Sequence, residues 1–164
     1  MKIFRTDLHI GLNNKLFEIS SGSLGLDKVS FSEDKITCTI HSEQAPNGYY
    51  LKGLMTVSIR ESCDRCLIDF NSKQKIEFSI LLTSDVKLIK NDEHDVIFFT
   101  DQDDAIEIDP VLAEYILLDR PLKKLCTEDC KGLCTSCGCN KNEIDCDCKQ
   151  ETQSSSREVL KNIN

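Results

Sequence analysis

The sequence predicts a mainly β protein of the α+β class, with an antiparallel sheet or partly closed barrel, one buried helix and a C-terminal cysteine-rich module. First, alternating or β-branched runs separated by turn residues occupy the first ninety residues. Second, a single proline-initiated apolar segment follows them. Third, seven of the ten cysteines lie within the 23 residues from Cys126 to Cys148.

The strand predictions rest on these runs and on the turns between them. Polar or glycine-containing breaks, of which Pro46-Asn47-Gly48 is the strongest, separate the runs. Since consecutive strands are close in sequence, antiparallel pairing is favoured. The expected strands are Lys2–Ile10, Leu16–Ser20, Lys35–His41, Tyr49–Arg60 and Lys75–Thr83.

The helix is expected at about residues 110–119, with Asp109 as N-cap and Pro110 at the first helical position. Its residues are apolar on nearly every side, which predicts burial against the sheet. Arg120-Pro121 ends it, because a residue before proline avoids the helical region. We therefore expect a β-rich domain over residues 1–121, and a flexible tail over 149–164, where three serines follow one another.

The N-terminal residues have no apolar core typical of a secretory signal, and no run approaches the length of a membrane span. These features predict a cytoplasmic protein without a membrane partner. Thiols are kept reduced in that compartment, so a cysteine cluster there indicates metal binding or catalysis more than disulfides.

The charge distribution constrains possible partners. The formal net charge is -8, and the segment from Asn91 to Asp119 holds ten acidic residues and no lysine or arginine. Broad attraction to nucleic acid usually requires a basic face, which this composition disfavours. A local basic patch is compatible with it.

The C-terminal cysteine spacing is typical of a zinc knuckle. Cys134-x2-Cys137 aims two sulfurs at one point, and the following Gly138 permits the positive φ of such a turn. Cys146-x-Cys148 supplies two further thiols. A tetrahedral zinc site is therefore predicted from Cys134, Cys137, Cys146 and Cys148.

Two other cysteine pairs each supply half of a second site. Cys63-x2-Cys66 is expected at a hairpin tip, and Cys126-x3-Cys130 follows the helix. A site from Cys63, Cys66, Cys126 and Cys130 would clasp a module over residues 122–148 to the 63–66 tip, for two zinc ions in all. An alternative places Cys130 in the C-terminal site instead of Cys146 or Cys148. Cys139 is then surplus, and Cys38 is expected to be a buried thiol within a strand.

Other chemistries fit less well. Iron–sulfur motifs have different spacings, and a redox C-x2-C normally begins a helix. No P-loop, dinucleotide-binding, metalloprotease or serine-hydrolase motif is present, so we expect neither an enzyme nor a small-molecule substrate. Two alternatives stay open, namely an acidic protein-binding zinc adaptor without RNA contact and a cytosolic thiol redox protein.

Several motifs together resemble the YceD family, the large ribosomal RNA subunit accumulation proteins. They are C-D-R-C-L at Cys63–Leu67, a helix ending in R-P-L, and C-x3-C-K-G-L-C-x2-C-G-x-N-x-N-x3-C-x-C at Cys126–Cys148. Cys139 and Lys141 depart from the usual pattern without touching a predicted ligand. The resemblance implies a non-enzymatic bacterial ribosome-biogenesis factor that supports large-subunit (23S) rRNA accumulation. Its partners would be that rRNA or a pre-ribosomal particle, and ribosomal or assembly proteins.

Basic residues beside the cysteines are candidates for RNA contact. If both metal sites form, these side chains converge on one end of the molecule, away from the acidic segment. The competing interpretation is that they only solvate the module and offset thiolate charge. The candidates are Arg65, Lys123, Lys124, Lys131 and Lys141.

Overall fold

The computed structural model describes residues 1–88, 95–100 and 102–148, and it divides the chain into two compact units. Unit 1 comprises Met1–Glu61 and Phe70–Leu122. Unit 2 comprises Ser62–Asp69 together with the chain from Lys123 onward. The tail predicted over 149–164 lies outside the described residues.

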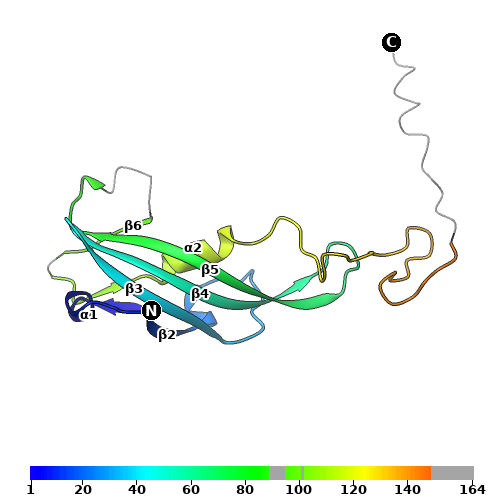
Figure 1. Ribbon diagram of the computed structural model, residues 1–164, viewed down its shortest axis with the longest axis horizontal. Coiled ribbons are helices and arrows are strands. Elements are labelled where there is room, and N and C mark those ends of the chain that lie inside the picture. The colour runs from blue at the N-terminus through cyan, green and yellow to red at the C-terminus, as the bar shows by residue number, and fades with distance from the viewer. Residues whose placement is uncertain (89–94, 101, 149–164) are drawn as a thin grey trace, which may run out of the picture. The chain divides into compact units, whose positions relative to one another are not determined.

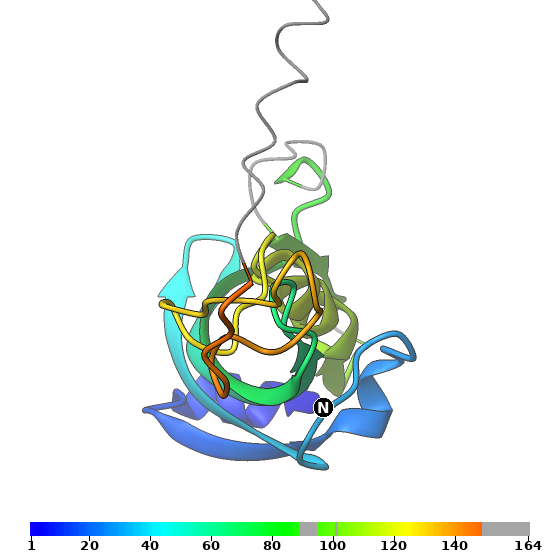
Figure 2. The same ribbon diagram turned by 90° about the vertical axis from the view of Figure 1, so that its right-hand side faces the viewer.

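The main sheet has five strands in the order β2-β3-β4-β5-β6 (Figure 1). β3 pairs antiparallel with β2 and with β4, whereas β6 runs parallel to β5. Seen end-on in Figure 2, the strands curl round, but in the described part of the chain β2 and β6 remain edges and the sheet does not close. The strands are β2 (Lys15–Ser20), β3 (Lys35–Ala45), β4 (Gly48–Ser62), β5 (Asp69–Thr83) and β6 (Asp95–Phe98).

Short elements complete the fold. β1 (Lys2–Phe4) pairs antiparallel with β7 (Ala105–Glu107), and α1 (Arg5–Ile10), the 3-10 turn η1 (Ser21–Leu24) and α2 (Asp109–Leu118) are the helical segments. The predicted mainly β class with an incompletely closed sheet is confirmed, although the described residues form two α-helices instead of one. The strand predicted over Lys2–Ile10 is wrong beyond Phe4. β1 pairs with only three residues, those of β7. After Phe4 the chain continues into α1, in which Leu8 is buried.

Helix α2 lies within one residue of its predicted bounds and packs against the sheet as predicted. Leu112, Ala113 and Ile116 are buried, whereas Leu118 is 83% exposed, so one face of the helix packs although its residues are apolar on nearly every side. Asp109 is not the N-cap, which is Ile108, and its carboxylate instead pairs with the α-amino group of Met1.

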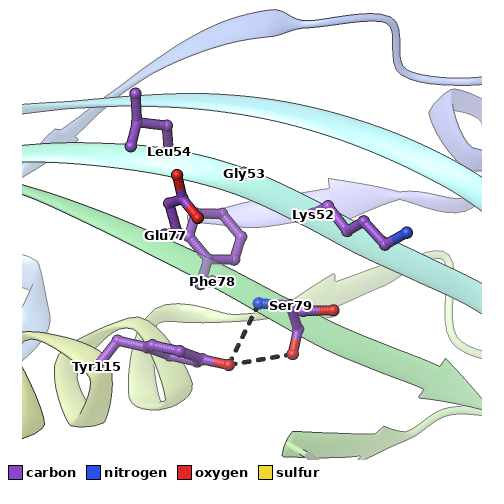
Figure 3. A pocket seen from close by; sticks show the side chains of 7 residues that line it. All are labelled: Lys52, Gly53, Leu54, Glu77, Phe78, Ser79 and Tyr115. Atoms are coloured by element: carbon purple, nitrogen blue, oxygen red, sulfur yellow. Dashed lines mark hydrogen bonds between the residues drawn. The ribbon is translucent and has the colours of Figure 1, made fainter.

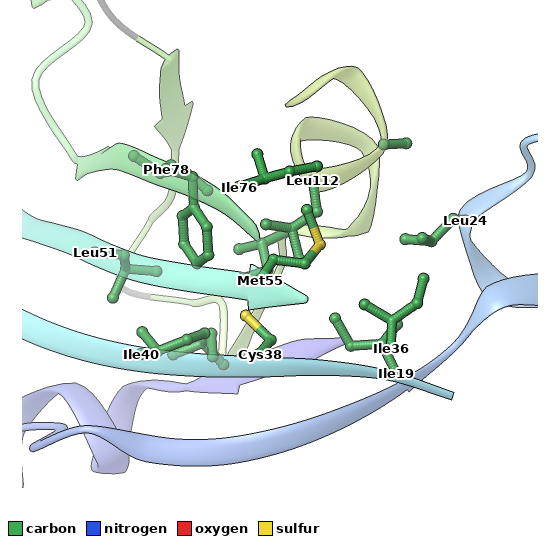
Figure 4. Close-up of a cluster of buried hydrophobic side chains, with 14 of the residues drawn as sticks. Ile19, Leu24, Ile36, Cys38, Ile40, Leu51, Met55, Ile76, Phe78 and Leu112 are labelled. Atoms are coloured by element: carbon green, nitrogen blue, oxygen red, sulfur yellow. The ribbon is translucent and has the colours of Figure 1, made fainter. Parts of the chain in front are cut away.

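The hydrophobic core lies between the sheet and α2 (Figure 4). Met55 of β4, Ile76 and Phe78 of β5 and Leu112 of α2 point into the same space. Every residue of this buried cluster belongs to unit 1. Since burying a large aliphatic side chain contributes about 1.5–3 kcal/mol, the cluster gives unit 1 a source of stability that needs no metal.

β6 pairs with only the last residues of β5, and next to that pairing a side chain covers the open edge of β5. The Tyr115 hydroxyl accepts from the Ser79 backbone N–H at 3.2 Å and donates to the Ser79 carbonyl at 3.1 Å (Figure 3). A hollow of about 540 Å³ lies beside it. Gly53 in this hollow has to be glycine, because a Cβ there would lie 2.4 Å from the Phe78 ring. Tyr115 thereby satisfies backbone groups that an edge strand leaves open.

An ion pair ties together two points where the chain leaves unit 1. The Arg120 guanidinium donates to the Glu61 carboxylate over 3.3 Å, and the Glu61 side chain is only 1% exposed. Glu61 stands two residues before Cys63, and Arg120 stands six before Cys126. The pair thus holds the starts of both cysteine-bearing segments next to each other.

Candidate metal centre

The β4–β5 hairpin ends in a tight turn that carries Cys63 and Cys66. The Cys63 N–H donates to the Ile68 carbonyl at 2.9 Å, and the Leu67 N–H donates to the Cys63 carbonyl at 2.9 Å. Leu67 adopts a φ of 61°, an unusual left-handed conformation for a leucine. These bonds fold the C-x2-C segment so that both sulfurs face the same point.

The segment from Lys123 onward is held against this turn by backbone bonds. Asp64 donates its N–H to the Lys124 carbonyl at 2.8 Å and accepts the Lys124 N–H on its carboxylate at 2.7 Å. The Arg65 guanidinium donates to the Cys130 carbonyl at 2.8 Å. Gly132 passes so close that a Cβ would lie 3.1 Å from the Arg65 carbonyl oxygen, which explains the glycine of the K-G-L sequence.

Four sulfurs meet where these segments join. The Sγ atoms of Cys63, Cys66, Cys126 and Cys130 all lie within 4.8 Å of one another. Cys63–Cys130 measures 3.7 Å and Cys66–Cys126 measures 3.6 Å. A disulfide would be about 2.05 Å, whereas a tetrahedron with Zn–S bonds of 2.3 Å has edges of about 3.8 Å. The spacing is that of four ligands around one cation.

The electrostatics of this group also favour a cation. Burial acts to raise the pKa of Cys63, but backbone hydrogen bonds from Cys126, Cys66 and Arg65 outweigh it and bring the pKa to about 6. A backbone hydrogen bond at Ile68 acts to lower the pKa of Cys66, but burial and the neighbouring thiols raise it to about 12. Four thiols this close cannot all ionise by themselves, whereas a bound divalent metal stabilises four thiolates.

Asn142 lies just outside this sulfur group and was not singled out as functional from the sequence. Its side-chain N–H donates to Cys130 Sγ at 3.3 Å, and its carbonyl oxygen accepts the Lys131 N–H at 2.8 Å. Asn140 in turn accepts from the Asn142 side chain at 2.8 Å. Hydrogen bonds from residues around a metal site orient its ligands. The N-x-N spacing within the cysteine-rich segment was the sequence signal that could have pointed to Asn142.

A second knuckle begins at Cys134. The Sγ atoms of Cys134, Cys137, Cys139 and Cys146 lie within 4.8 Å of one another. This set shares three members with the predicted ligands and has Cys139 where the prediction had Cys148. Interaction with the Cys137 thiol is the main reason that the pKa of Cys148 rises to about 12, so Cys148 borders the same group. Backbone hydrogen bonds at Cys137 and Ser136 are the main reason that the pKa of Cys134 falls to about 6.

The remaining predicted residues take different places. Lys123 and Lys131 are exposed, whereas Lys124 and Lys141 are half-buried. Arg65 is exposed but engages the Cys130 carbonyl. Cys38 is fully buried in the core of unit 1, where burial raises its pKa to about 12. Among the described helices, none has the length and apolar content needed to cross a bilayer.

Comparison with known proteins settles the family. A family model described as "Large ribosomal RNA subunit accumulation protein YceD" matches residues 51–164. The chain belongs to the YceD family. The YceD match begins in β4 and contains all the cysteines of both sulfur groups, and the family name implies a role in large-subunit rRNA accumulation. Neither the curated proteins nor the solved structures contain a match.

Proposed function

We propose that this protein is a non-enzymatic cytoplasmic factor of bacterial ribosome assembly that supports large-subunit (23S) rRNA accumulation, with unit 2 organised by two zinc ions. The observation that carries the proposal is the YceD match over residues 51–164, which includes both sulfur groups. Its partners are large-subunit rRNA or a pre-ribosomal particle, together with ribosomal or assembly proteins.

The donor set supports zinc in a structural role. All the gathered ligand atoms are thiol sulfurs, which favour zinc over magnesium or calcium. Four protein ligands fill a tetrahedral zinc and leave no open position for water or substrate, as in structural sites. Zinc bound in this way would hold the Cys126–Cys130 segment to the hairpin tip.

Contact with RNA, if direct, has to be local. The described residues of unit 2 carry five basic and seven acidic side chains, so this unit has no overall basic face. Among the described lysines of unit 2, Lys123 and Lys131 are the exposed ones and are the best placed to meet phosphates. The acidic residues of unit 1, including Glu107 and Glu114, are exposed and suit a basic ribosomal protein.

Native mass spectrometry before and after acidification tests the metal content. Two zinc ions per chain support the proposal. One zinc ion removes the site that uses Cys63 and Cys66. No zinc contradicts the metal part and revives a thiol redox function.

A cellular experiment tests the rRNA role. In cells lacking the protein, the ratio of large- to small-subunit rRNA should fall, and the wild-type gene should restore it. The double variant Cys63→Ser/Cys66→Ser should fail to restore the ratio, whereas Cys38→Ala, which removes a thiol outside both groups, should succeed. Restoration by the double variant would show that the first site is dispensable for this role.

Charge reversal of Lys123, Lys124 and Lys131 to glutamate tests direct phosphate contact. The slope of log affinity for rRNA against log salt should decrease by about 2 to 3, because each lost phosphate contact removes just under one unit. The matched control reverses Lys28, Lys73 and Lys75, exposed lysines of unit 1, for the same change in net charge. Unchanged association of the first variant at low salt rules out phosphate contact by these lysines.

RNase treatment separates direct from protein-mediated association. A ribosomal complex that dissociates on RNA digestion supports RNA contact. A complex that survives intact indicates the adaptor function instead, with the exposed acidic residues of unit 1 docking a basic protein.

A further inference from the structure

The second sulfur group holds one thiol more than a tetrahedral metal can use. Cys134, Cys137, Cys139 and Cys146 are mutually close, and Cys148 follows Cys146 by two residues and interacts with Cys137, which is the main reason that the pKa of Cys148 is raised. Zinc in structural sites takes four ligands. A bound ion therefore leaves one of these five thiols uncoordinated.

The two knuckles show why the surplus thiol arises at Cys139. In the first, the Cys63 N–H donates to the Ile68 carbonyl, and in the second the Cys134 N–H donates to the Cys139 carbonyl at 2.8 Å. Leu67 and Gly138 also match, each with a positive φ and an N–H bonded to the carbonyl of the first cysteine. Cys139 thus occupies the position that Ile68 has in the first knuckle, and its sulfur lies within 4.8 Å of those of Cys134, Cys137 and Cys146.

The two sulfur groups also differ in access to solvent. Cys63, Cys66 and Cys130 are buried in the first group, with only Cys126 half-buried. In the second group only Cys134 is buried, and Cys137 and Cys148 are exposed. Small oxidants in solution therefore reach the second group more easily than the first.

We propose that the second group is a five-thiol metal site in which Cys139 and Cys148 are alternative fourth ligands, and that hydroperoxides release its metal before that of the first site. The inference rests on the proposed metal binding. Cys134, Cys137 and Cys146 are the constant ligands. Whichever of Cys139 and Cys148 is uncoordinated stays against the metal-bound sulfur of Cys137.

The reaction with a hydroperoxide balances as a two-electron oxidation. The uncoordinated thiol gives up its proton and attacks the O–O bond as the thiolate, giving a sulfenic acid and, once the released oxygen takes that proton, one water or alcohol. The Cys137 sulfur then attacks the sulfur of the sulfenic acid and displaces hydroxide. The hydroxide takes a second proton and leaves as water. The new disulfide joins Cys137 to Cys139 or Cys148, and the metal, having lost a ligand, dissociates.

Metal stoichiometry of variants tests the interchange of ligands. Native mass spectrometry should find two metals in wild type, in Cys139→Ser and in Cys148→Ser, but one in the double variant Cys139→Ser/Cys148→Ser. Loss of a metal in either single variant overturns the interchange. Retention of two metals in the double variant overturns it as well. Absence of metal from wild type would instead defeat the proposed function, so the two failures are distinguishable.

Peroxide treatment of the full chain tests the release. A chromogenic zinc indicator should report one fast and one slow metal, and peptide mapping after the fast phase should find Cys137 in a disulfide with Cys139 or Cys148. Both single variants lack the surplus thiol, so their fast phase should slow several-fold, while Cys38→Ala should behave as wild type. A wild-type rate in the single variants, or disulfides first at Cys63 or Cys66, overturns the proposal.

Discussion

Among single side chains, Asn142 has the most consequential position outside the ligands. Its amide reaches from the turn after the second knuckle to the sulfur of Cys130 in the first group. A hydrogen bond to a metal-bound thiolate offsets part of its charge and fixes its direction. Asn142 therefore makes the first site depend on the fold of the second segment.

The variant Asn142→Ala should weaken binding of one of the two metals by about 10- to 100-fold, the usual cost of losing an outer partner of a ligand. Zinc competition against a chromogenic chelator measures this change. Asn142→Asp keeps an oxygen that can accept the Lys131 N–H but cannot donate to sulfur, so it should also weaken binding. Asn71→Ala, on β5, is the control, and unchanged affinities in both Asn142 variants would contradict the role.

The spacing of cysteines in the sequence predicts which of them form a site. Contacts that depend on the folded chain cannot be predicted in this way. Spacing alone joins Cys63-x2-Cys66 with Cys126-x3-Cys130, and the structure brings these sulfurs together, although metal binding there stays a prediction. The fourth member of the second group could not be predicted, because Cys139 and Cys148 each stand two residues from another thiol. The N-x-N spacing marks Asn142, but its contact with Cys130 could not be predicted, since the two residues are 12 apart in the chain.

At the level of elements, the two knuckles share one backbone geometry but differ at one residue. The position with positive φ is Leu67, at 61°, in the first knuckle and Gly138, at 74°, in the second. For a residue with a Cβ, this conformation costs about 1–2 kcal/mol. The first knuckle therefore forms under a strain that the second avoids.

Opposite substitutions at this position should have opposite effects. Gly138→Ala should weaken zinc binding about fivefold, because about 1 kcal/mol of strain enters the folded turn, where a Cβ would meet nothing within 4 Å. Leu67→Gly should leave binding equal or slightly tighter, because relief of strain is partly offset by the backbone entropy of glycine. Chelator competition measures both. Tighter binding in Gly138→Ala would contradict the shared geometry.

The strands illustrate what periodicity can predict for elements. β2 to β5 follow alternating patterns that a half-buried sheet requires, so their existence was predictable, although β5 starts six residues before the predicted Lys75. The exposed and half-buried residues of that first part carry little apolar signal. Helix α1 was missed because its six residues bury only Leu8, too little for a helical period to show. The parallel pairing of β6 depends on tertiary placement and leaves no local signal.

At the scale of the whole molecule, the two units are stabilised by different means. The buried hydrophobic cluster lies entirely in unit 1. Among the residues of unit 2 up to Cys148 that the structure describes, the buried ones are Cys63, Cys66, Cys130, Cys134 and Gly132. A unit whose interior consists mainly of thiols would gain its folding free energy from a metal bound to them.

Metal removal should therefore unfold unit 2 and leave unit 1 folded. Acidification followed by a strong chelator removes zinc, since protons compete for the thiolates and affinity falls as the pH is lowered. After return to neutral pH, hydrogen exchange should show lost protection at Cys63–Ile68 and Cys126–Cys146, with protection retained in β3 and β4 up to Glu61. Protection kept in unit 2 without metal, or lost equally in unit 1, would contradict this division.

The sequence separation of the ligands in the first sulfur group also determines when that site can form during synthesis. Cys66 and Cys126 lie 60 residues apart in the chain. At a synthesis rate of 5–20 residues per second, Cys126 is added about 3–12 s after Cys66. For those seconds the nascent chain carries a C-x2-C turn with two of the four ligands, so a metal captured early is held by half a site. A complete set of four ligands for this site exists only after Cys126 and Cys130 have been added.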